Sequence, residues 1–254
     1  MTHFVRALVD SVDVAEARDK FLQAMTALGV NHAFYAGRFM LTVPRTLVRE
    51  SPVTFSNLPQ ALIDDSQHLY GLERDGWVDW VLHHDGDISS HDLLTNIGVE
   101  RSPSLAVGAK HGLYAVRILS LRNIAMHSVG AVIIAPRKDM THEQLDDFWA
   151  EHGDELRLLS KTLHLRMATL PRETAVSTLT SRQREVLSWR SAGKTVSEIG
   201  TILGITPATV EKHMRLAREA LGVETTPQAV LKAHVTHQLF QPASLPLTLH
   251  LPTG

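Results

Sequence analysis

The chain contains no cysteine among its 254 residues. This absence excludes disulfide bonds, zinc sites with cysteine ligands and a thiol nucleophile. Aromatic residues are scarce as well, at 6%, but a hydrophobic content of 44% is typical of a globular protein with a real core. A chain of this length suits one medium-sized domain and one small domain.

The sequence also lacks the segments that would place it in a membrane. No apolar run reaches about 18 residues, the length that a membrane-spanning helix requires. The N-terminus, MTHFVRALVDSVDVAEARDKF, interleaves acidic residues and has no charged region followed by an apolar one, so it is not a signal peptide. We therefore expect a cytoplasmic protein with no membrane partner.

Motifs of catalysis are missing too. There is no Gly-rich phosphate loop, no Gly-x-Ser-x-Gly and no paired-carboxylate pattern. His83-His84-Asp85-Gly86-Asp87, with His91-Asp92, has the residue types of a metal site. Adjacent histidines on a helix point about 100° apart, however, and a solvated turn is the simpler interpretation. We expect no catalytic residue, no metal and no cofactor.

What the sequence does contain is a set of helix start and stop signals in residues 179–240. Thr180 is followed three residues later by Gln183 and Thr195 by Glu198, which is the spacing of a capping box. Thr206-Pro207 and Thr226-Pro227 place proline at the first helical position. Glycines that can end a helix stand in the breaks, at Gly193, Gly204 and Gly222. The pattern predicts four short helices.

The second and third of these helices, at about 195–203 and 207–220, are separated only by Gly204-Ile205-Thr206. A turn of that length sets two helices across each other, as in a helix-turn-helix. Apolar residues recur at helical spacing and would close one small core. These are Val186, Leu187, Trp189, Ile199, Ile202, Leu203, Ile205, Val210, Met214, Ala217 and Leu221. The third helix then faces outward with Ala208, Glu211, Lys212, Arg215 and Arg218, a face that a major groove can accept.

Charge is distributed unevenly along the chain. Residues 179–240 carry eight Lys and Arg against five Asp and Glu, a net charge of +3, whereas the other 192 residues carry 17 against 22, a net charge of −5. The positive charge lies where a polyphosphate would be met, which favours a module that binds double-stranded DNA. Taken alone, the pattern also fits a four-helix packing module with a solvated face.

Several motifs in this segment match a known family over nearly its whole length. They are Leu179-Thr180-x-Arg182-x-x-Glu185-Val186-Leu187, Gly193-Lys194-Thr195-x-x-Glu198-Ile199, Ile202-Leu203-x-Ile205, Thr209-Val210-x-x-His213 and Leu221-Gly222-Val223. The segment resembles the helix-turn-helix domain of the LuxR/NarL/FixJ class of bacterial transcription regulators.

The resemblance implies roles for particular residues. Glu211, Lys212 and Arg215 would face the bases from the third helix, and Glu185 would form a structural salt bridge. The residues that would position the DNA backbone, at helix starts or on the flank of the third helix, are Lys194, Thr195, Thr209 and Arg218.

The first 165 residues read as mixed α/β. We expect helices at 12–28, 58–69, 76–83 and 143–165, and strands at 32–39, 47–49, 113–121 and 129–135. The fold class is therefore α+β, with an N-terminal α/β/α sandwich around an antiparallel sheet and a C-terminal four-helix domain. The expected boundaries are a ligand and dimerisation domain at 1–165, a linker at 166–178, the helix-turn-helix domain at 179–240 and an extended tail at 241–254.

In arrangement this first half resembles the autoinducer-binding domain of LuxR-type quorum sensors. That family holds an acyl-homoserine lactone with a Pro-x-x-Trp-x-x-x-Tyr segment, an Asp-Pro pair and a later Trp. Aligned from Pro59, the chain has Leu62 for the Trp, Ser66 for the Tyr, Asp75-Gly76 for the Asp-Pro pair, Ser90 for the later Trp and Val116 for a glycine. The positions that the resemblance implies for a ligand are Leu62, Ser66, Tyr70, Asp75, Trp77, Ser90 and Val116.

The departures from the pattern have consequences. Leu62 has no donor for a lactone carbonyl, and Ser66 keeps a hydroxyl but no aromatic wall. Asp75 could accept a hydrogen bond from a ligand amide, or it could be a helix-terminal acid on a solvated turn. Tyr70, Trp77 and Trp80 could rebuild the wall, or belong to the core. We expect lactones to bind at micromolar concentration or weaker, and a different ligand, or none, stays open.

The alternative of a phosphoacceptor receiver domain fails, because it needs an aspartate near residue 55, where the chain has Phe55.

The sequence thus predicts a LuxR-type regulator modulated by a small signal such as an acyl-homoserine lactone. A homodimer on paired half-sites is expected, with Val230, Ala233, His234 and His237 of the fourth helix between the DNA-binding domains. The alternative is a ligand-independent regulator whose first half only dimerises or binds a protein partner.

Overall fold

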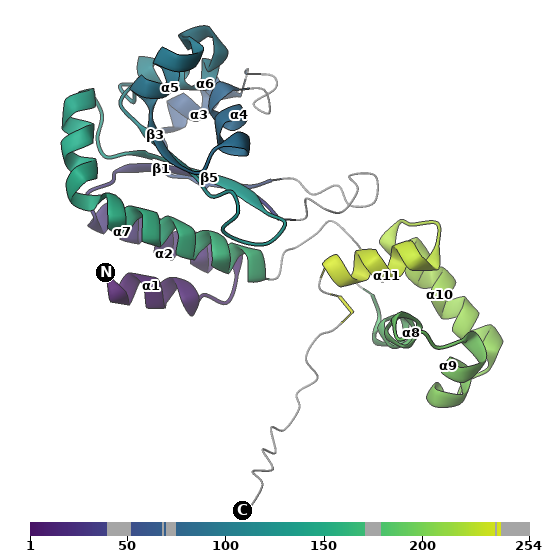
Figure 1. Ribbon diagram of the computed structural model, residues 1–254. Coiled ribbons are helices and arrows are strands. Elements are labelled where there is room, and N and C mark those ends of the chain that lie inside the picture. The colour runs from purple at the N-terminus through teal and green to yellow at the C-terminus, as the bar shows by residue number, and fades with distance from the viewer. Residues whose placement is uncertain (40–51, 68, 70–74, 171–178, 237, 240–254) are drawn as a thin grey trace, which may run out of the picture. The chain divides into compact units, whose positions relative to one another are not determined.

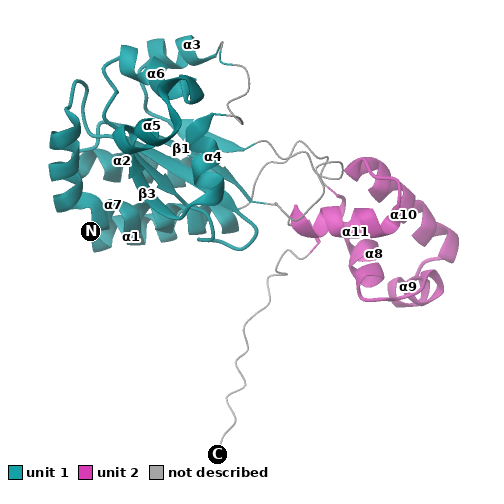
Figure 2. Cartoon of the chain, turned by 45° about the horizontal axis from the view of Figure 1, so that its top comes forward, with its two compact units in different colours: residues 1–43, 50–170 teal, residues 44–49, 171–254 magenta. Residues whose placement is uncertain are grey.

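The structure is a computed structural model, and it describes residues 1–39, 52–67, 69, 75–170, 179–236 and 238–239. The chain divides into two compact units (Figure 2). The described part of unit 1 lies within residues 1–170, and that of unit 2 begins at Leu179. The expected strand at 47–49 and the expected tail at 241–254 fall outside the described residues.

Unit 1 is a three-layer α/β/α sandwich (Figure 1). Its elements are α1 (Thr2–Val9), α2 (Val14–Ala27), β1 (His32–Arg38), β2 (Val53–Ser56), α3 (Gln60–Ser66), α4 (Gly76–His83), β3 (Gly86–Ser89), α5 (Ser90–Ile97), a 3-10 turn (Val99–Arg101), α6 (Pro103–Lys110), β4 (Arg117–Ser120), β5 (Val129–Ala135) and α7 (His142–Thr169). The strands form one antiparallel sheet in the order β2-β1-β5-β4-β3. The predicted fold class is confirmed.

The central strand β5 explains why the sheet is covered on both faces. Its sequence, VGAVIIA, is apolar without alternation, which is typical of a strand buried on both sides. Val132 and Ile134 pack with α1, α2 and α7 in one core, while Ala131 and Ile133 pack with α4, α5 and α6 in a second core. Figure 1 shows these two groups of helices on opposite faces of the sheet.

Prediction of the elements of unit 1 was correct where the apolar period was long. The helix at 76–83 is confirmed, as is the strand at 129–135, whereas the strand predicted at 113–121 covers only Arg117–Ser120. Five elements were missed, namely α1, β2, β3, α5 and α6. They have four to eight residues each, and their short apolar patterns were not distinguished from those of loops.

The last helix of unit 1 is longer than predicted. A capping box opens α7, since Thr141 accepts from the Gln144 amide while the Gln144 side chain accepts from the Thr141 amide. The helix ends at Thr169, and Leu170 is fully buried in the first core. The expected linker start at residue 166 is therefore wrong, because Arg166 lies inside the helix and donates to the Ser11 carbonyl.

Unit 2 consists, in its described residues, of α8 (Ser181–Ser191), α9 (Val196–Leu203), α10 (Pro207–Leu221) and α11 (Thr226–Val235). The predicted capping boxes at Thr180 and Thr195 are confirmed, and Gly204 and Gly222 end their helices in the left-handed conformation. The cap of α11 is Thr225 rather than Thr226, so Pro227 is the second helical residue.

Two predicted core residues of unit 2 are wrong. Trp189 is 37% exposed and Ile202 is 44% exposed. The other nine predicted residues pack in two groups, one around Leu187, Ala217 and Leu221 and one around Val186, Ile199 and Val210. Ala229 and Ala233 of α11, which the predicted core did not include, complete the first group.

Candidate DNA-binding surface and ligand cavity

The turn between α9 and α10 is fixed by backbone contacts and one arginine. Gly200 faces the Ile205 carbonyl oxygen so closely that a Cβ at this residue would lie 2.9 Å from it. Arg182 of α8 donates to the Leu203 carbonyl at the end of α9 over 2.8 Å and pairs with Glu185 at 2.7 Å. Glu185 thus has the structural role that the family resemblance implied.

The outward face of α10 carries the residues expected to read bases. Val210, Met214, Ala217 and Leu221 are buried, which turns the opposite side of the helix to solvent. Glu211, Lys212 and Arg215 are all exposed on that side. The Arg215 guanidinium pairs with Glu219 one turn later at 2.6 Å, while no ion pair involves Lys212 within the described part of the chain. Two cations and one carboxylate therefore present donors and acceptors together.

The residues expected to position the DNA backbone already serve the fold. Thr195 caps α9, and its amide and hydroxyl donate to Glu198, which lowers the pKa of that carboxyl; Lys194, at 3.3 Å, lowers it further. The Thr209 hydroxyl is 2.8 Å from that of Thr206.

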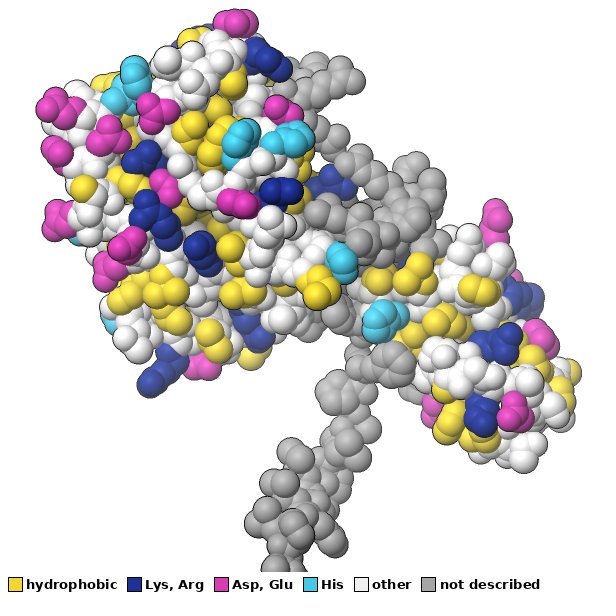
Figure 3. Space-filling view, in the orientation of Figure 1, with side chains coloured by type: hydrophobic (Ala, Val, Ile, Leu, Met, Phe, Trp, Pro, Cys, Tyr) yellow, Lys and Arg dark blue, Asp and Glu magenta, His cyan; other side chains and the backbone are white. Residues whose placement is uncertain are grey.

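Arg218 is half-buried and donates to the Thr226 hydroxyl at 3.0 Å, so it links α10 to α11. Figure 3 shows basic and acidic side chains interspersed on the face of unit 2 that it presents.

The fourth helix of unit 2 differs from the expected contact surface. Ala233, expected to face a second copy, is fully buried, and Val230 is half-buried against the core. The solvent side of α11 instead carries Leu231, 41% exposed, and His234. His237 lies outside the described residues.

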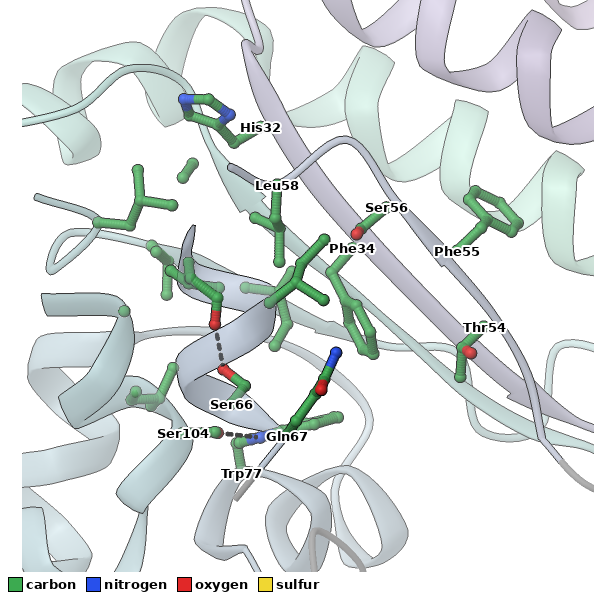
Figure 4. Close-up of a pocket in the computed structure, with 18 residues that line it drawn as sticks. His32, Phe34, Thr54, Phe55, Ser56, Leu58, Ser66, Gln67, Trp77 and Ser104 are labelled. Atoms are coloured by element: carbon green, nitrogen blue, oxygen red, sulfur yellow. Dashed lines mark hydrogen bonds between the residues drawn. The ribbon is translucent and has the colours of Figure 1, made fainter. Parts of the chain in front are cut away.

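Unit 1 contains a cavity of about 370 Å³ between the sheet and helices α3, α4 and α6 (Figure 4). The interior of the cavity is apolar, and Leu105, Leu113 and Ile133 are among the side chains that line it. No Asp, Glu, Lys or Arg belongs to its described lining, in which His32 is the one titratable side chain. A cavity of this size and character suits an uncharged, largely apolar small molecule.

Four of the predicted ligand residues line this cavity, namely Leu62, Ser66, Trp77 and Val116. Two of their polar groups are already bound within the protein. The Ser66 hydroxyl donates to the Leu62 carbonyl at 2.7 Å, and the Trp77 indole N–H donates to the Ser104 hydroxyl at 2.9 Å. Figure 4 shows both bonds as dashed lines. Tyr70 lies outside the described residues.

Two other predicted ligand residues do not line the cavity. Asp75 is 2% exposed and caps α4, with its carboxylate accepting from the Trp77 and Ser104 amides and from the Ser102 hydroxyl. Ser90 is 1% exposed and ties the start of α5 to the segment before β4, since its hydroxyl donates to the Tyr114 carbonyl and accepts from the Val116 amide. Trp80, also considered for the wall, stacks on His84 instead.

Sequence reasoning missed most residues of the wall, among them those of the short strand β2 and its neighbour β1. Thr54 and Ser56 line the cavity, as do His32 and Phe34. The signal was present in the strand alternation of residues 53–56, where Thr54 and Ser56 share one face and Phe55 stacks on Tyr35 across the other. Gln67, directly after α3, was missed as well.

The histidine-rich segment is part of the fold. Asp87 lies on β3 and pairs with Arg157 of α7 at 2.7 Å and with Arg117 of β4 at 3.6 Å. Both guanidinium groups lie over the Trp149 ring, at 5.0 and 5.1 Å. No group of three or more His, Asp or Glu side chains in the described ranges is placed to hold a metal ion.

Among the described residues, no helix has the length and apolarity that crossing a bilayer demands.

The two units together define a class of protein, namely a helix-turn-helix module preceded by an α/β unit with an internal cavity. Residues 177–233 match the family model described as "Bacterial regulatory proteins, luxR family". The C-terminal unit is thus a helix-turn-helix domain of that family, and the chain is similar to LuxR-type transcription regulators. Such regulators are not enzymes, as the sequence predicted.

Curated relatives agree with this assignment. The transcriptional repressor ThaA of Burkholderia thailandensis is 28% identical over 91% of this chain and 94% of its own length. The transcriptional activator protein BjaR1 of Bradyrhizobium diazoefficiens is 40% identical, but the match spans 31% of this chain and only 32% of that protein.

Solved structures share the fold. The crystal structure of Escherichia coli SdiA has a TM-score of 0.61 at 19% identity and covers 94% of this chain and 98% of its own. SdiA in complex with octanoyl-rac-glycerol has a TM-score of 0.55 at 19% identity, with coverages of 92% and 93%. CepR2 of Burkholderia cenocepacia, described as N-acylhomoserine lactone dependent, has a TM-score of 0.51 at 16% identity over 66% of this chain and 94% of its own.

Proposed function

We propose that this regulator binds paired half-sites in double-stranded DNA through α10, and that an uncharged amphipathic molecule in the cavity of unit 1 controls that binding. The observation that carries the proposal is the uncharged, apolar cavity in the unit that precedes the DNA-binding domain. Acyl chains suit its depth, and the ligands named for SdiA and CepR2 are both acyl compounds.

Control by a ligand follows from mass action. A molecule that binds only the folded state stabilises it by about 2.7 kcal/mol at a concentration one hundred times its dissociation constant. A ligand that prefers one arrangement of the regulator shifts the population toward that arrangement. Because relatives include both a repressor and an activator, the proposal concerns DNA affinity and not the direction of regulation.

The proposed DNA contacts are those of the outward face of α10, with Glu211, Lys212 and Arg215 at base edges and Lys194, Thr195, Thr209 and Arg218 near the phosphates. We infer that two copies occupy paired half-sites, because one helix-turn-helix reads one half-site. The solvent side of α11, with Leu231 and His234, is the proposed contact between the two DNA-binding units.

The test combines a thermal-shift screen with DNA binding. The full chain is titrated with acyl-homoserine lactones and monoacylglycerols of six to twelve carbons, and its affinity for a selected operator is measured with and without each compound. We expect at least one compound to raise the melting temperature and to change the DNA affinity. If none raises it and the bare protein binds the operator fully, the chain is a ligand-independent regulator instead.

A further inference from the structure

The one carboxylate that the sequence offered to a ligand is already occupied by the protein. The Asp75 carboxylate accepts the Ser104 amide at 3.0 Å, the Trp77 amide at 3.4 Å and the Ser102 hydroxyl. Its side chain is 2% exposed and is absent from the lining of the cavity. Releasing it would leave these buried donors unpaired, which is costly.

The backbone around Asp75 is built for the same contact. A Cβ on Gly76 would lie 2.9 Å from the Arg101 carbonyl oxygen, so the start of α4 approaches the 3-10 turn closely only because residue 76 is glycine. Ser102, which begins the next segment, is fully buried. Trp77 and Ser104, both bonded to Asp75 through their amides, line the cavity themselves.

The cavity lining also carries polar side chains that make no side-chain hydrogen bond within the described part of the chain. These are the Thr54 and Ser56 hydroxyls of the edge strand β2 and the Gln67 amide after α3. Thr54 and Gln67 are exposed and Ser56 is half-buried, so they lie toward the mouth, whereas Leu62, Leu105 and Val116 are buried. Figure 4 shows Thr54 and Ser56 on the strand that crosses one side of the cavity.

We propose that the ligand's polar head is recognised by Thr54, Ser56 and Gln67, and that Asp75 is a structural clamp which does not contact it. The inference rests on the proposed function and deepens it by naming the chemistry of the ligand. Hydroxyl and amide side chains both donate and accept, so they suit the oxygens of an ester, a lactone or a glycerol head. With no carboxylate to receive an amide N–H, an acyl amide gains no hydrogen bond to a charged acceptor. It should therefore bind about as tightly as an acyl ester of equal length.

Matched ligands test the role of Asp75. Isothermal titration of the full chain compares 1-octanoyl-rac-glycerol with N-(2,3-dihydroxypropyl)octanamide, and N-octanoyl-homoserine lactone with its ester analogue, in which oxygen replaces the amide N–H. We expect the two dissociation constants of each pair to agree within about threefold. An amide that binds tenfold or more tightly than its ester in both pairs would overturn the inference, because a bond to a charged acceptor contributes that much.

Variants of the chain test the role of Asp75 and the proposed head-group site separately. Asp75→Asn and the milder Ser102→Ala should lower the melting temperature without changing the amide-to-ester ratio. Thr54→Val and Ser56→Ala should each weaken 1-octanoyl-rac-glycerol about three- to tenfold at an unchanged melting temperature. The matched control is Thr95→Val, since Thr95 is exposed on α5 away from the cavity.

The outcomes separate the two proposals. If none of the four compounds binds, the ligand class of the proposed function is wrong and the inference fails with it. If they bind, but Ser102→Ala or Asp75→Asn changes the amide-to-ester ratio tenfold, only the inference fails. Affinities unaltered by both Thr54→Val and Ser56→Ala would likewise contradict the assigned head-group site.

Discussion

Lys212 and Arg215 are the two exposed cations on the outward face of α10. Lys212 has no ion-pair partner among the described residues, whereas Arg215 already pairs with Glu219. We expect Lys212→Ala and Arg215→Ala each to cost about 1–3 kcal/mol on the selected operator and much less on random DNA. The loss of operator affinity should be smaller for Arg215→Ala than for Lys212→Ala, because the wild-type Arg215 must first break its ion pair with Glu219 to contact DNA.

Competition binding at one fixed salt concentration measures both effects. Lys232→Ala, which removes a charge from α11 of the same unit, is the control for net charge. Equal losses on operator and on random DNA would reassign Lys212 and Arg215 to phosphate contacts.

His142, the first residue of α7, makes stability depend on pH. Burial lowers the pKa of its imidazole, and the neighbouring His91, whose ring lies 5.1 Å away, lowers it further. The folded chain therefore takes up this proton at lower pH than the unfolded chain does. The contribution of His142 to stability is complete above a pH of about 6.5, the ordinary histidine value, and is lost as the pH falls below it.

Urea unfolding at pH 7.5 and pH 5.5 checks this expectation. The natural chain should lose more stability between the two values than His142→Gln does. His83→Gln, which removes an exposed histidine, serves as the comparison. A His142→Gln variant with an unchanged pH dependence would refute the assignment to His142.

At the level of elements, the angle between α9 and α10 depends on the close approach of Gly200 to the Ile205 carbonyl. Gly200→Ala forces the turn apart and should destabilise unit 2 by about 1–3 kcal/mol while weakening operator binding. Thr201→Ala, one residue along on the exposed side of α9, should change stability by no more than about 0.5 kcal/mol. Equal stabilities of the two variants in thermal unfolding would contradict the role of Gly200.

The elements also show where sequence reasoning succeeds. The helices of unit 2 were predictable because each has a threonine cap and a glycine or proline at its boundary, which are local signals. The short elements β2, α5 and α6 carry weaker local signals, and their conformation depends on packing against the sheet. Asp75 was predicted to bind a ligand, with a helix-terminal acid on a solvated turn as the alternative. It caps α4 but is buried, because its partners Ser102 and Ser104 are nearly thirty residues away and left no pattern.

At the level of the whole molecule, the cores of unit 1 and unit 2 share no residue. We therefore expect two unfolding transitions in calorimetry. Leu156 and Leu187 are both fully buried, one in each unit. Leu156→Ala and Leu187→Ala should each lower one transition by about 2–5 kcal/mol and leave the other in place. A single transition that moves with both substitutions would show that the units unfold together.

The position of β5 connects the cavity to the last helix of unit 1. Ile133 lines the cavity, while Val132 and Ile134, on the other side of the same strand, pack in the core with α7. Gly130 faces His164 of α7, and a Cβ at residue 130 would lie 2.6 Å from the imidazole ring. The strand and the helix are therefore in close contact at this point. Because packed protein interiors have low compressibility, a displacement of β5 on the cavity side should be transmitted to α7 on the other side. A molecule that displaces Ile133 should alter hydrogen exchange at the buried amides of α7, on the far side of the sheet from where it binds.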